Sequence, residues 1–128
     1  MQTTRHATYD LNYHLVWLPQ DRQSVLGGDI ADRVASIIHE IAEDKGLDVQ
    51  DLAIQSDHVH LVVTSPPKHS PALLANWFKG ISSRKYNHRY ADHDGEKIRW
   101  ARGYYAGTAG NVSSETVEQY IQHQQDHA

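Results

Sequence analysis

Two histidines stand on either side of a single valine in the stretch SDHVHLVVTSPP, residues 56–67. The apolar run around them is typical of a strand, and residues two apart in a strand share a face. His58 and His60 therefore project together, while Val59 and Leu61 project from the opposite face. Imidazoles about 7 Å apart at their Cα atoms can direct two nitrogens at one divalent cation. The alternative is that the pair faces water or bonds to neighbouring residues.

The end of the chain supplies a second pair of polar residues, at helical spacing. The stretch SETVEQYIQHQQDHA, residues 114–128, is predicted to form a helix with Ser113 or Ser114 as its N-cap. Tyr120 and Gln124 are four residues apart, so they lie on the same side of that helix. A phenol and an amide oxygen can approach one point from there. The alternative is a partly exposed tyrosine on an ordinary amphipathic helix.

Basic side chains gather in another predicted helix, which Ser70 caps and which runs to about Tyr90. Residues 68–105 contain eight Lys and Arg against three Asp and Glu, although the whole chain has a net charge of −4. This asymmetry is compatible with one basic face on an acidic protein. The residues that can line a path for a nucleic-acid backbone are Lys79, Arg84, Lys85 and Arg89. The alternative is a solvated basic side of a helix.

Two further residues stand close to the histidine pair in this interpretation. Asp57 can orient an imidazole as a hydrogen-bond acceptor, or can simply make the turn between two strands, and we favour the turn. His14 shares a strand face with Val16 and can reach the site, depending on the strand register.

The elements that must position these residues follow from hydrophobic spacing. Alternating apolar residues predict strands over 8–18, 47–55 and 58–65, and a helical pattern begins at a capping Asp29 and ends at Lys45. A fourth strand is predicted over 98–110 despite its glycines.

The resulting order is strand, helix, strand, strand, helix, strand, followed by the terminal helix. This order predicts an α+β, ferredoxin-like (RRM-like) sandwich, in which two helices cover one face of a four-stranded antiparallel sheet. The open face of that sheet is the natural place for function.

Length and composition limit the class of protein. A chain of 128 residues with 39% hydrophobic residues is expected to form one domain, spanning 1–128. Without cysteines, a disulfide, a thiolate metal site and a cysteine nucleophile are all excluded. The apolar runs predict neither a membrane span nor a secretion signal, so we expect a cytoplasmic protein.

Several motifs, in order along the chain, resemble one known family. SDHVHLVV, KGISSRKY and TAGNVSSETVEQYIQHQ, together with YHLVWLPQDR and IIHEIAEDKGL nearer the start, are similar to segments of the small single-tyrosine transposases of insertion sequences. These are the HUH-type, TnpA-like transposases of the IS200-like family. The resemblance spans nearly the whole chain.

The resemblance implies a role for each matching residue. His58, His60 and Gln124 would be metal ligands, and Tyr120 on the terminal helix would be the catalytic nucleophile. The partners it implies are single-stranded DNA, in the form of hairpin ends of an insertion sequence, and a second copy of the chain. In that homodimer the terminal helix of one chain can complete the active site of the other.

The chemistry that fits is metal-dependent cleavage and rejoining of a phosphodiester through a 5′-phosphotyrosine. Hard phosphate oxygens favour Mg²⁺ or Mn²⁺ over Zn²⁺ as the cofactor. Two alternatives stay open: a domesticated relative that processes repeated hairpins, and a nucleic-acid-binding module that cuts nothing.

Overall fold

The sheet at the centre of this protein is formed by four strands, two of which are consecutive in the sequence and joined by a short turn. The structure is a computed structural model that describes residues 2–3, 8–9, 11–20, 24–91, 96–108 and 114–126. The elements, in chain order, are β1 (Gln2–Thr3), β2 (Thr8–Tyr9), β3 (Asn12–Trp17), α1 (Asp29–Lys45), β4 (Asp48–Gln55), β5 (His58–Thr64), α2 (Pro71–Tyr90), β6 (Tyr105–Thr108) and α3 (Ser114–Asp126).

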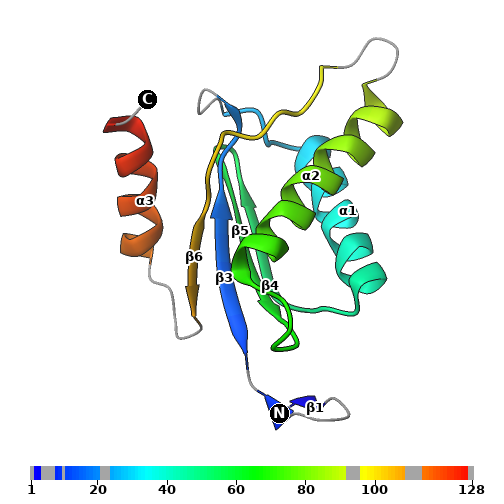
Figure 1. Cartoon of the computed structure of the whole chain (residues 1–128). Helices are drawn as coiled ribbons and strands as arrows, with labels where there is room; N and C mark the ends of the chain where they lie inside the picture. Colours follow the sequence, from blue (N-terminus) through cyan, green and yellow to red (C-terminus); the bar gives the residue numbers. More distant parts are fainter. Residues whose placement is uncertain are drawn as a thin grey trace.

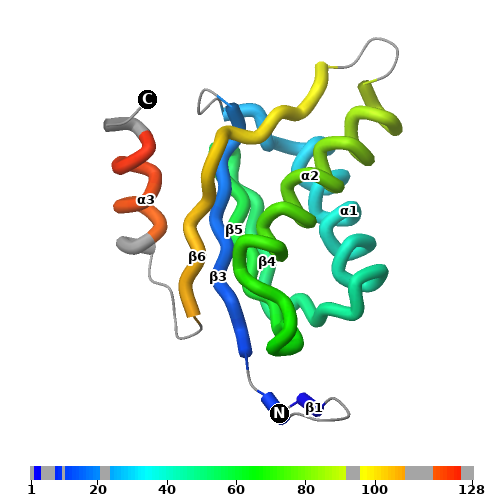
Figure 2. Tube along the Cα trace, in the orientation of Figure 1, coloured from blue at the N-terminus to red at the C-terminus, as the bar shows by residue number. Residues whose placement is uncertain are grey.

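The main sheet has the strand order β4-β5-β3-β6, and every pairing in it is antiparallel. Helices α1 and α2 lie side by side on one face of the sheet, and α3 lies on the other face (Figure 1). The Cα trace shows the same three layers, with β6 at the edge nearest α3 (Figure 2). The short strands β1 and β2 pair with each other outside this sheet. The predicted α+β, ferredoxin-like architecture is therefore confirmed, including a terminal helix that carries Tyr120.

Strand alternation separates the core from the open face. Leu15 and Trp17 of β3 pair with Leu61 and Val59 of β5, and all four side chains are fully buried. They pack against apolar residues of the two helices, among them Ile37, Ile38, Leu74 and Phe78. The intervening residues of β3 and β5 consequently project toward α3.

The helix ends follow local sequence signals, with one correction. Ser70 caps α2 by accepting a hydrogen bond from the amide of Leu73 (3.1 Å), and Gly46 ends α1 in the left-handed conformation (φ 70°). Asp29 does not cap α1 as predicted, because it is the first helical residue and Gly28 occupies the cap position without a side-chain bond. Its carboxylate lies in the first turn, where the helix dipole favours a negative charge.

The fourth strand is shorter than predicted. Its paired residues are Tyr105–Thr108, and before them only an isolated bridge joins Trp100 to Pro19 within the described residues. The segment preceding β6 instead runs along α2: Asn87 exchanges two hydrogen bonds with the backbone of Ile98 (2.7 and 3.0 Å). The end of the predicted strand at 109–110 and the predicted cap Ser113 lie outside the described residues.

Lys79 of α2 fixes the next part of the same segment. Its ammonium donates to the carbonyl oxygens of Ala101 (2.8 Å) and Gly103 (2.7 Å), and Gly103 has a positive φ of 82°. The ammonium of Lys79 lies in a partly desolvated position, and this burial lowers its pKa. The two bonds hold the chain against α2 immediately before it enters β6.

Replacing Lys79 with methionine should lower the free energy of unfolding by about 1–2 kcal/mol, because two backbone carbonyls lose a charged donor while the aliphatic stem is kept. Urea unfolding followed by circular dichroism measures this. Arg84→Met is the control: Arg84 is exposed on the same helix, so its change should stay within about 0.5 kcal/mol. Equal stability of the two variants would contradict the bracing role of Lys79.

Candidate active site

The open face of the sheet brings together histidines from two strands. His60 of β5 lies opposite Val16 of β3, so it is a diagonal neighbour of His14, which is only 5% exposed. Nδ1 of His14 and Nε2 of His60 are 3.2 Å apart. The ring centroids are 5.5 Å apart and the ring planes differ by 22°, so the two rings meet nitrogen to nitrogen, nearly in one plane. The expectation that His14 reaches the histidine pair is confirmed.

The first histidine of the pair has a partner of a different kind. Nδ1 of His58 lies 2.8 Å from Oδ1 of Asp57, which stands in the turn between β4 and β5. Both roles considered for Asp57 are therefore present: it makes the turn, and its carboxylate also holds the imidazole. A carboxylate held against one ring nitrogen fixes the orientation of the ring and leaves the other nitrogen available.

The electrostatic environment keeps the second histidine neutral. Burial lowers the pKa of His60, and the neighbouring His14 lowers it further. Asp51 on β4 acts in the opposite direction but does not reverse the shift. A neutral imidazole is the form that binds a metal ion, so His60 requires no loss of a proton before it can act as a ligand.

A hollow lies between this face and α3. It is lined by Ala53, Gln55, His58, His60, Val117, Glu118 and Ile121. Val117 is buried, and Glu118 and Ile121 of the same helix also line the hollow. Tyr120 and Gln124 belong to the described residues but do not line the hollow.

Tyr120 instead faces the edge strand. Its ring lies 6.1 Å from that of Tyr105 on β6, measured between centroids, with a tilt of 55°. Burial raises the pKa of the Tyr120 phenol. Tyr105 in turn lies across Gly107, where a Cβ would stand only 2.6 Å from the Tyr105 hydroxyl. A glycine at this position therefore leaves room for the tyrosine that contacts Tyr120.

The structure thus brings together some of the predicted site residues and separates others. His58 and His60 share one hollow, whereas Tyr120 and Gln124 lie on the helix above it, outside its lining. Among the residues that the structure describes, no three His, Asp, Glu or Cys side chains are grouped to hold a metal ion. The assignment of Gln124 as third ligand and of Tyr120 as nucleophile stays a prediction.

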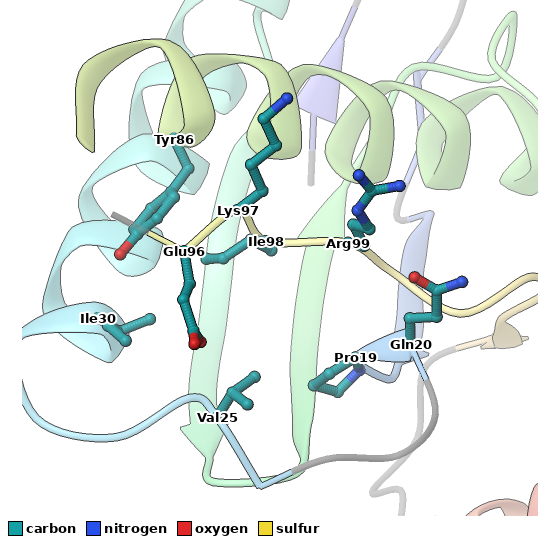
Figure 3. Close-up of a pocket in the computed structure, with 9 residues that line it drawn as sticks. All are labelled: Pro19, Gln20, Val25, Ile30, Tyr86, Glu96, Lys97, Ile98 and Arg99. Carbon is teal, nitrogen blue, oxygen red and sulfur yellow. The ribbon is translucent and has the colours of Figure 1, made fainter. Parts of the chain in front are cut away.

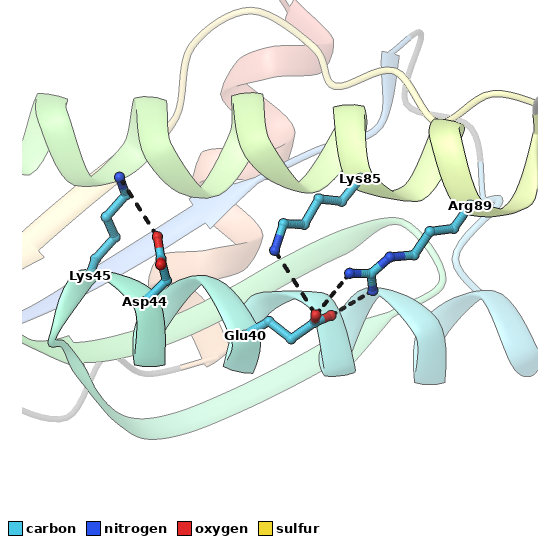
Figure 4. Close-up of polar contacts among 5 residues, drawn as sticks. All are labelled: Glu40, Asp44, Lys45, Lys85 and Arg89. Atoms are coloured by element: carbon cyan, nitrogen blue, oxygen red, sulfur yellow. Dashed lines mark hydrogen bonds and ion pairs between the residues drawn. The ribbon is translucent and has the colours of Figure 1, made fainter.

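The predicted basic path lies on the other side of the sheet, on α2. Arg89 makes two hydrogen bonds to the carboxylate of Glu40 on α1 (2.6 and 2.8 Å), and Lys85 stands 4.0 Å from it (Figure 4). The Arg89 bond is the main cause of a lowered pKa of Glu40. Lys79 has the carbonyl partners described above, and Arg84 is exposed. Contacts of these four residues with DNA stay a prediction.

A second hollow lies between α1, α2 and residues 96–99, away from the histidines. Glu96, Lys97 and Arg99 border it, with the buried ring of Tyr86 and Ile30 at its wall (Figure 3). Charges of both signs meet there, and none of the predicted catalytic residues lines it.

Sequence reasoning missed two residues that this geometry makes important, Tyr105 and Glu40. Tyr105 stands two residues before Gly107, so the two share a strand face, and a glycine there signals a close approach of another group. No local pattern links Glu40 to Arg89, because the two residues are 49 positions apart in the chain and lie on different helices.

Known proteins with this fold include transposases. A crystal structure of a proposed transposase from Deinococcus radiodurans R1 superposes with a TM-score of 0.87 at 28% identity, covering 97% of this chain and 98% of the other. The structure of a REP-associated tyrosine transposase bound to a REP hairpin has a TM-score of 0.58 at 14% identity, covering 96% and 67%, and supports the fold alone.

Sequence comparison gives the family. Residues 7–124 match the family described as "Transposase IS200 like". The ISDra2 transposase TnpA of Deinococcus radiodurans is 31% identical over 98% of this chain and 92% of its own length, and the IS200 transposase of Salmonella typhimurium is 30% identical over 93% and 80%. The chain belongs to the IS200-like transposase family.

Replacing Tyr105 with alanine should loosen α3, because an aromatic pair contributes about 0.5–1.5 kcal/mol. Amide hydrogen exchange in residues 117–124 should then become about 2- to 10-fold faster, as mass spectrometry measures. Gly107→Ala should have a similar effect, since its methyl group displaces the Tyr105 ring.

The double variant Tyr105→Ala/Gly107→Ala distinguishes loss of the Tyr105–Tyr120 contact from a general destabilisation of the fold. With the ring gone, the methyl group has nothing to displace, so the double variant should exchange no faster than Tyr105→Ala. Additive effects of the two substitutions would show that they act independently of the Tyr105–Tyr120 contact.

Proposed function

We propose that this chain is a metal-dependent transposase that cleaves and rejoins single-stranded DNA through a covalent bond to Tyr120. The observation that carries the proposal is the position of α3, which bears Tyr120, over the sheet face that holds His58 and His60. Membership of the IS200-like family supports transposition as the overall process. The reaction class that fits both is transfer of a DNA strand by way of a protein nucleophile.

His58, His60 and Gln124 are the residues that would hold a divalent cation. The donor set supports this, because His58 is held by Asp57 and His60 is kept neutral, as metal-binding imidazoles require. When bound, Mg²⁺ or Mn²⁺ would polarise a non-bridging oxygen of the scissile phosphate. Neutral ligands suit that task since they leave the positive charge of the ion undiminished.

The cleavage step is a displacement at phosphorus. The phenolic oxygen of Tyr120 bonds to phosphorus, and the bond from phosphorus to the 3′ oxygen breaks. The products are a 5′-phosphotyrosine and a strand that ends in a 3′ hydroxyl; the phenol loses a proton and the departing oxygen gains one. Burial against Tyr105 raises the pKa of the phenol further above its ordinary value of about 10. More polar surroundings would therefore make Tyr120 a better nucleophile.

Rejoining reverses the same chemistry. The 3′ hydroxyl of another strand attacks the phosphotyrosine, a phosphodiester forms, and Tyr120 recovers its proton. A phenolate is a better leaving group than an aliphatic alkoxide because its conjugate acid has a pKa of about 10. The exchange therefore needs neither ATP nor water.

We further propose a homodimer in which active sites are completed by the partner's terminal helix. The supporting observation is that Tyr120 packs on β6 of its own chain and does not line the hollow beside His58 and His60. Moving α3 to a second chain would offer Tyr120 a different sheet face without unfolding the core.

The substrate is proposed to be a hairpin end of an insertion sequence. A protein of this fold has been solved with a REP hairpin bound, which makes a hairpin a reasonable ligand class here. A domesticated relative that processes repeated hairpins would use the same chemistry. Since the substrate is genomic DNA, we place the protein in the cytoplasm; none of the helices in the described part of the chain has the length and apolarity needed to cross a bilayer.

Tyr120→Phe should abolish the covalent DNA adduct and leave DNA binding unchanged, because it removes one oxygen from the protein. The measurement is an SDS gel after incubation with tiled single-stranded oligonucleotides from the DNA flanking the gene, with Mg²⁺ or Mn²⁺ and with chelator. Tyr9→Phe, on the separate ribbon of β1 and β2, is the matched control and should retain the adduct.

Three outcomes separate the proposals. An adduct that requires metal and vanishes in Tyr120→Phe supports the transposase chemistry. An adduct that persists in Tyr120→Phe places the nucleophile elsewhere. Binding without an adduct under any metal favours a nucleic-acid-binding module without catalysis.

Glu40→Gln should tighten binding of single-stranded DNA if Lys85 and Arg89 contact phosphates, because their present counter-charge is removed. The slope of log K against log salt should steepen by about 0.7, the value for one additional phosphate contact on a single strand. Fluorescence anisotropy over a salt series measures both. Glu43→Gln on the same helix removes an equal charge from an exposed position and is the control. Equal effects of the two variants would place the DNA path elsewhere.

A further inference from the structure

The two histidines of the pair contact their protein partners through different ring nitrogens. His58 is held at Nδ1 by Asp57 (2.8 Å), whereas His60 is held at Nε2 by His14 (3.2 Å). Each ring therefore has one nitrogen engaged with a protein partner, and the atom left over differs between the two rings: Nε2 in His58 and Nδ1 in His60.

The geometry at His60 is that of a hydrogen bond between two rings. Two ligands of one ion turn their lone pairs toward a shared point beside them, whereas here the rings meet nitrogen to nitrogen, nearly in one plane. A proton shared along this line satisfies both nitrogens. His14 is almost fully buried, so its ring cannot turn to water for another partner.

We propose that His14 is a positioning residue that fixes the tautomer of His60: His60 donates its Nε2–H to Nδ1 of His14 and keeps the lone pair of Nδ1 for a cation. The cation-binding nitrogens of the pair are then Nε2 of His58 and Nδ1 of His60. This inference rests on the proposed function, which requires a lone pair for the cation on both histidines of the pair.

The direction of the hydrogen bond between His60 and His14 follows from the requirement that His58 and His60 each keep one lone pair for the cation. At His58 it is fixed, because a carboxylate only accepts, so Nδ1 carries the proton and Nε2 the lone pair. If His14 instead donated to His60, Nε2 of His60 would be occupied as the acceptor and Nδ1 would carry the proton. Neither nitrogen of His60 would then be open to a ligand. Only donation from His60 to His14 leaves both histidines of the pair able to bind.

Tautomers are measured directly by long-range ¹H–¹⁵N correlation NMR on the metal-free protein at mildly alkaline pH. The expected result is a proton on Nδ1 of His58 and on Nε2 of His60. A proton on Nδ1 of His60 would overturn the proposal. The measurement uses the unmodified chain and no DNA, so its outcome is independent of whether Tyr120 forms an adduct.

A matched pair of variants tests the consequence for metal binding. His14→Asn keeps an acceptor oxygen close to the position of Nδ1. His14→Leu introduces a side chain with the same branched shape as asparagine but without an acceptor. Titration with Mn²⁺, followed by its electron paramagnetic resonance, should show a Kd about 10- to 100-fold weaker for His14→Leu, the usual effect of removing a second hydrogen bond from a ligating histidine. His14→Asn should stay near the unmodified protein.

His39→Asn, an exposed histidine on α1 on the opposite side of the sheet, should leave Mn²⁺ affinity unchanged. Equal loss of affinity in His14→Asn and His14→Leu would reduce His14 to a packing residue and contradict the proposal. If His14→Leu does not fold, the NMR result and His14→Asn still decide it. A protein with the expected tautomers that forms no adduct would reject the transposase chemistry while leaving the role of His14 intact.

Discussion

The pairing of β3 with β5 determines both what is buried in this protein and what is available for chemistry. Leu15 faces Leu61 and Trp17 faces Val59 under the helices, while Val16 faces His60 on the other side. A slip of one residue would turn the apolar side chains to the open face and the histidines into the core. The cost of exposing several large apolar groups therefore fixes the position of His60 against His14. The burial of the core side chains thus also fixes the geometry of the histidine site.

The terminal helix is attached to this framework much more lightly. Helix α1 buries five residues, Val34, Ile37, Ile38, Ile41 and Ala42, whereas Val117 is the one buried side chain among those described on α3. Glu118 and Ile121 also line the hollow beside the sheet, and Tyr120 contacts Tyr105 of β6. Elements with few buried apolar contacts open at a lower free energy than the core of the same domain. Such weak attachment suits the reaction proposed above, in which α3 brings Tyr120 to DNA and then releases it.

Much of this arrangement follows from local patterns in the sequence. The alternation in β5 places His58 and His60 on one face, and the spacing of Ile37, Ile38 and Ile41 gives α1 its buried side, because both depend only on the periods of strand and helix. The contact of His14 with His60 joins positions 46 apart in the chain and depends on strand register, which no local pattern states. The predicted strand over 98–110 fails for a similar reason. Residues 99–101 keep two backbone hydrogen bonds to residues 18 and 20 (2.8 Å each). Lys79 and Asn87 of α2 bind other backbone groups of residues 98–103, so the regular strand pairing begins only at Tyr105.

Charge counted along the sequence also differs from charge presented on the surface. The basic excess of residues 68–105 suggested a free basic face, yet Arg89 and Lys85 meet Glu40 from another helix, and Lys79 is engaged with carbonyls. The basic helix α2 also lies on the face of the sheet opposite α3 (Figure 1), whereas the histidine pair lines the hollow beside α3. Because the sheet lies between them, one DNA strand that touched α2 and the histidine hollow of the same chain would have to pass around the sheet edge. Two chains remove that difficulty, because the basic helix of one can lie beside the histidine face of the other. The arrangement of charge and histidines is thus another argument for the homodimer proposed above.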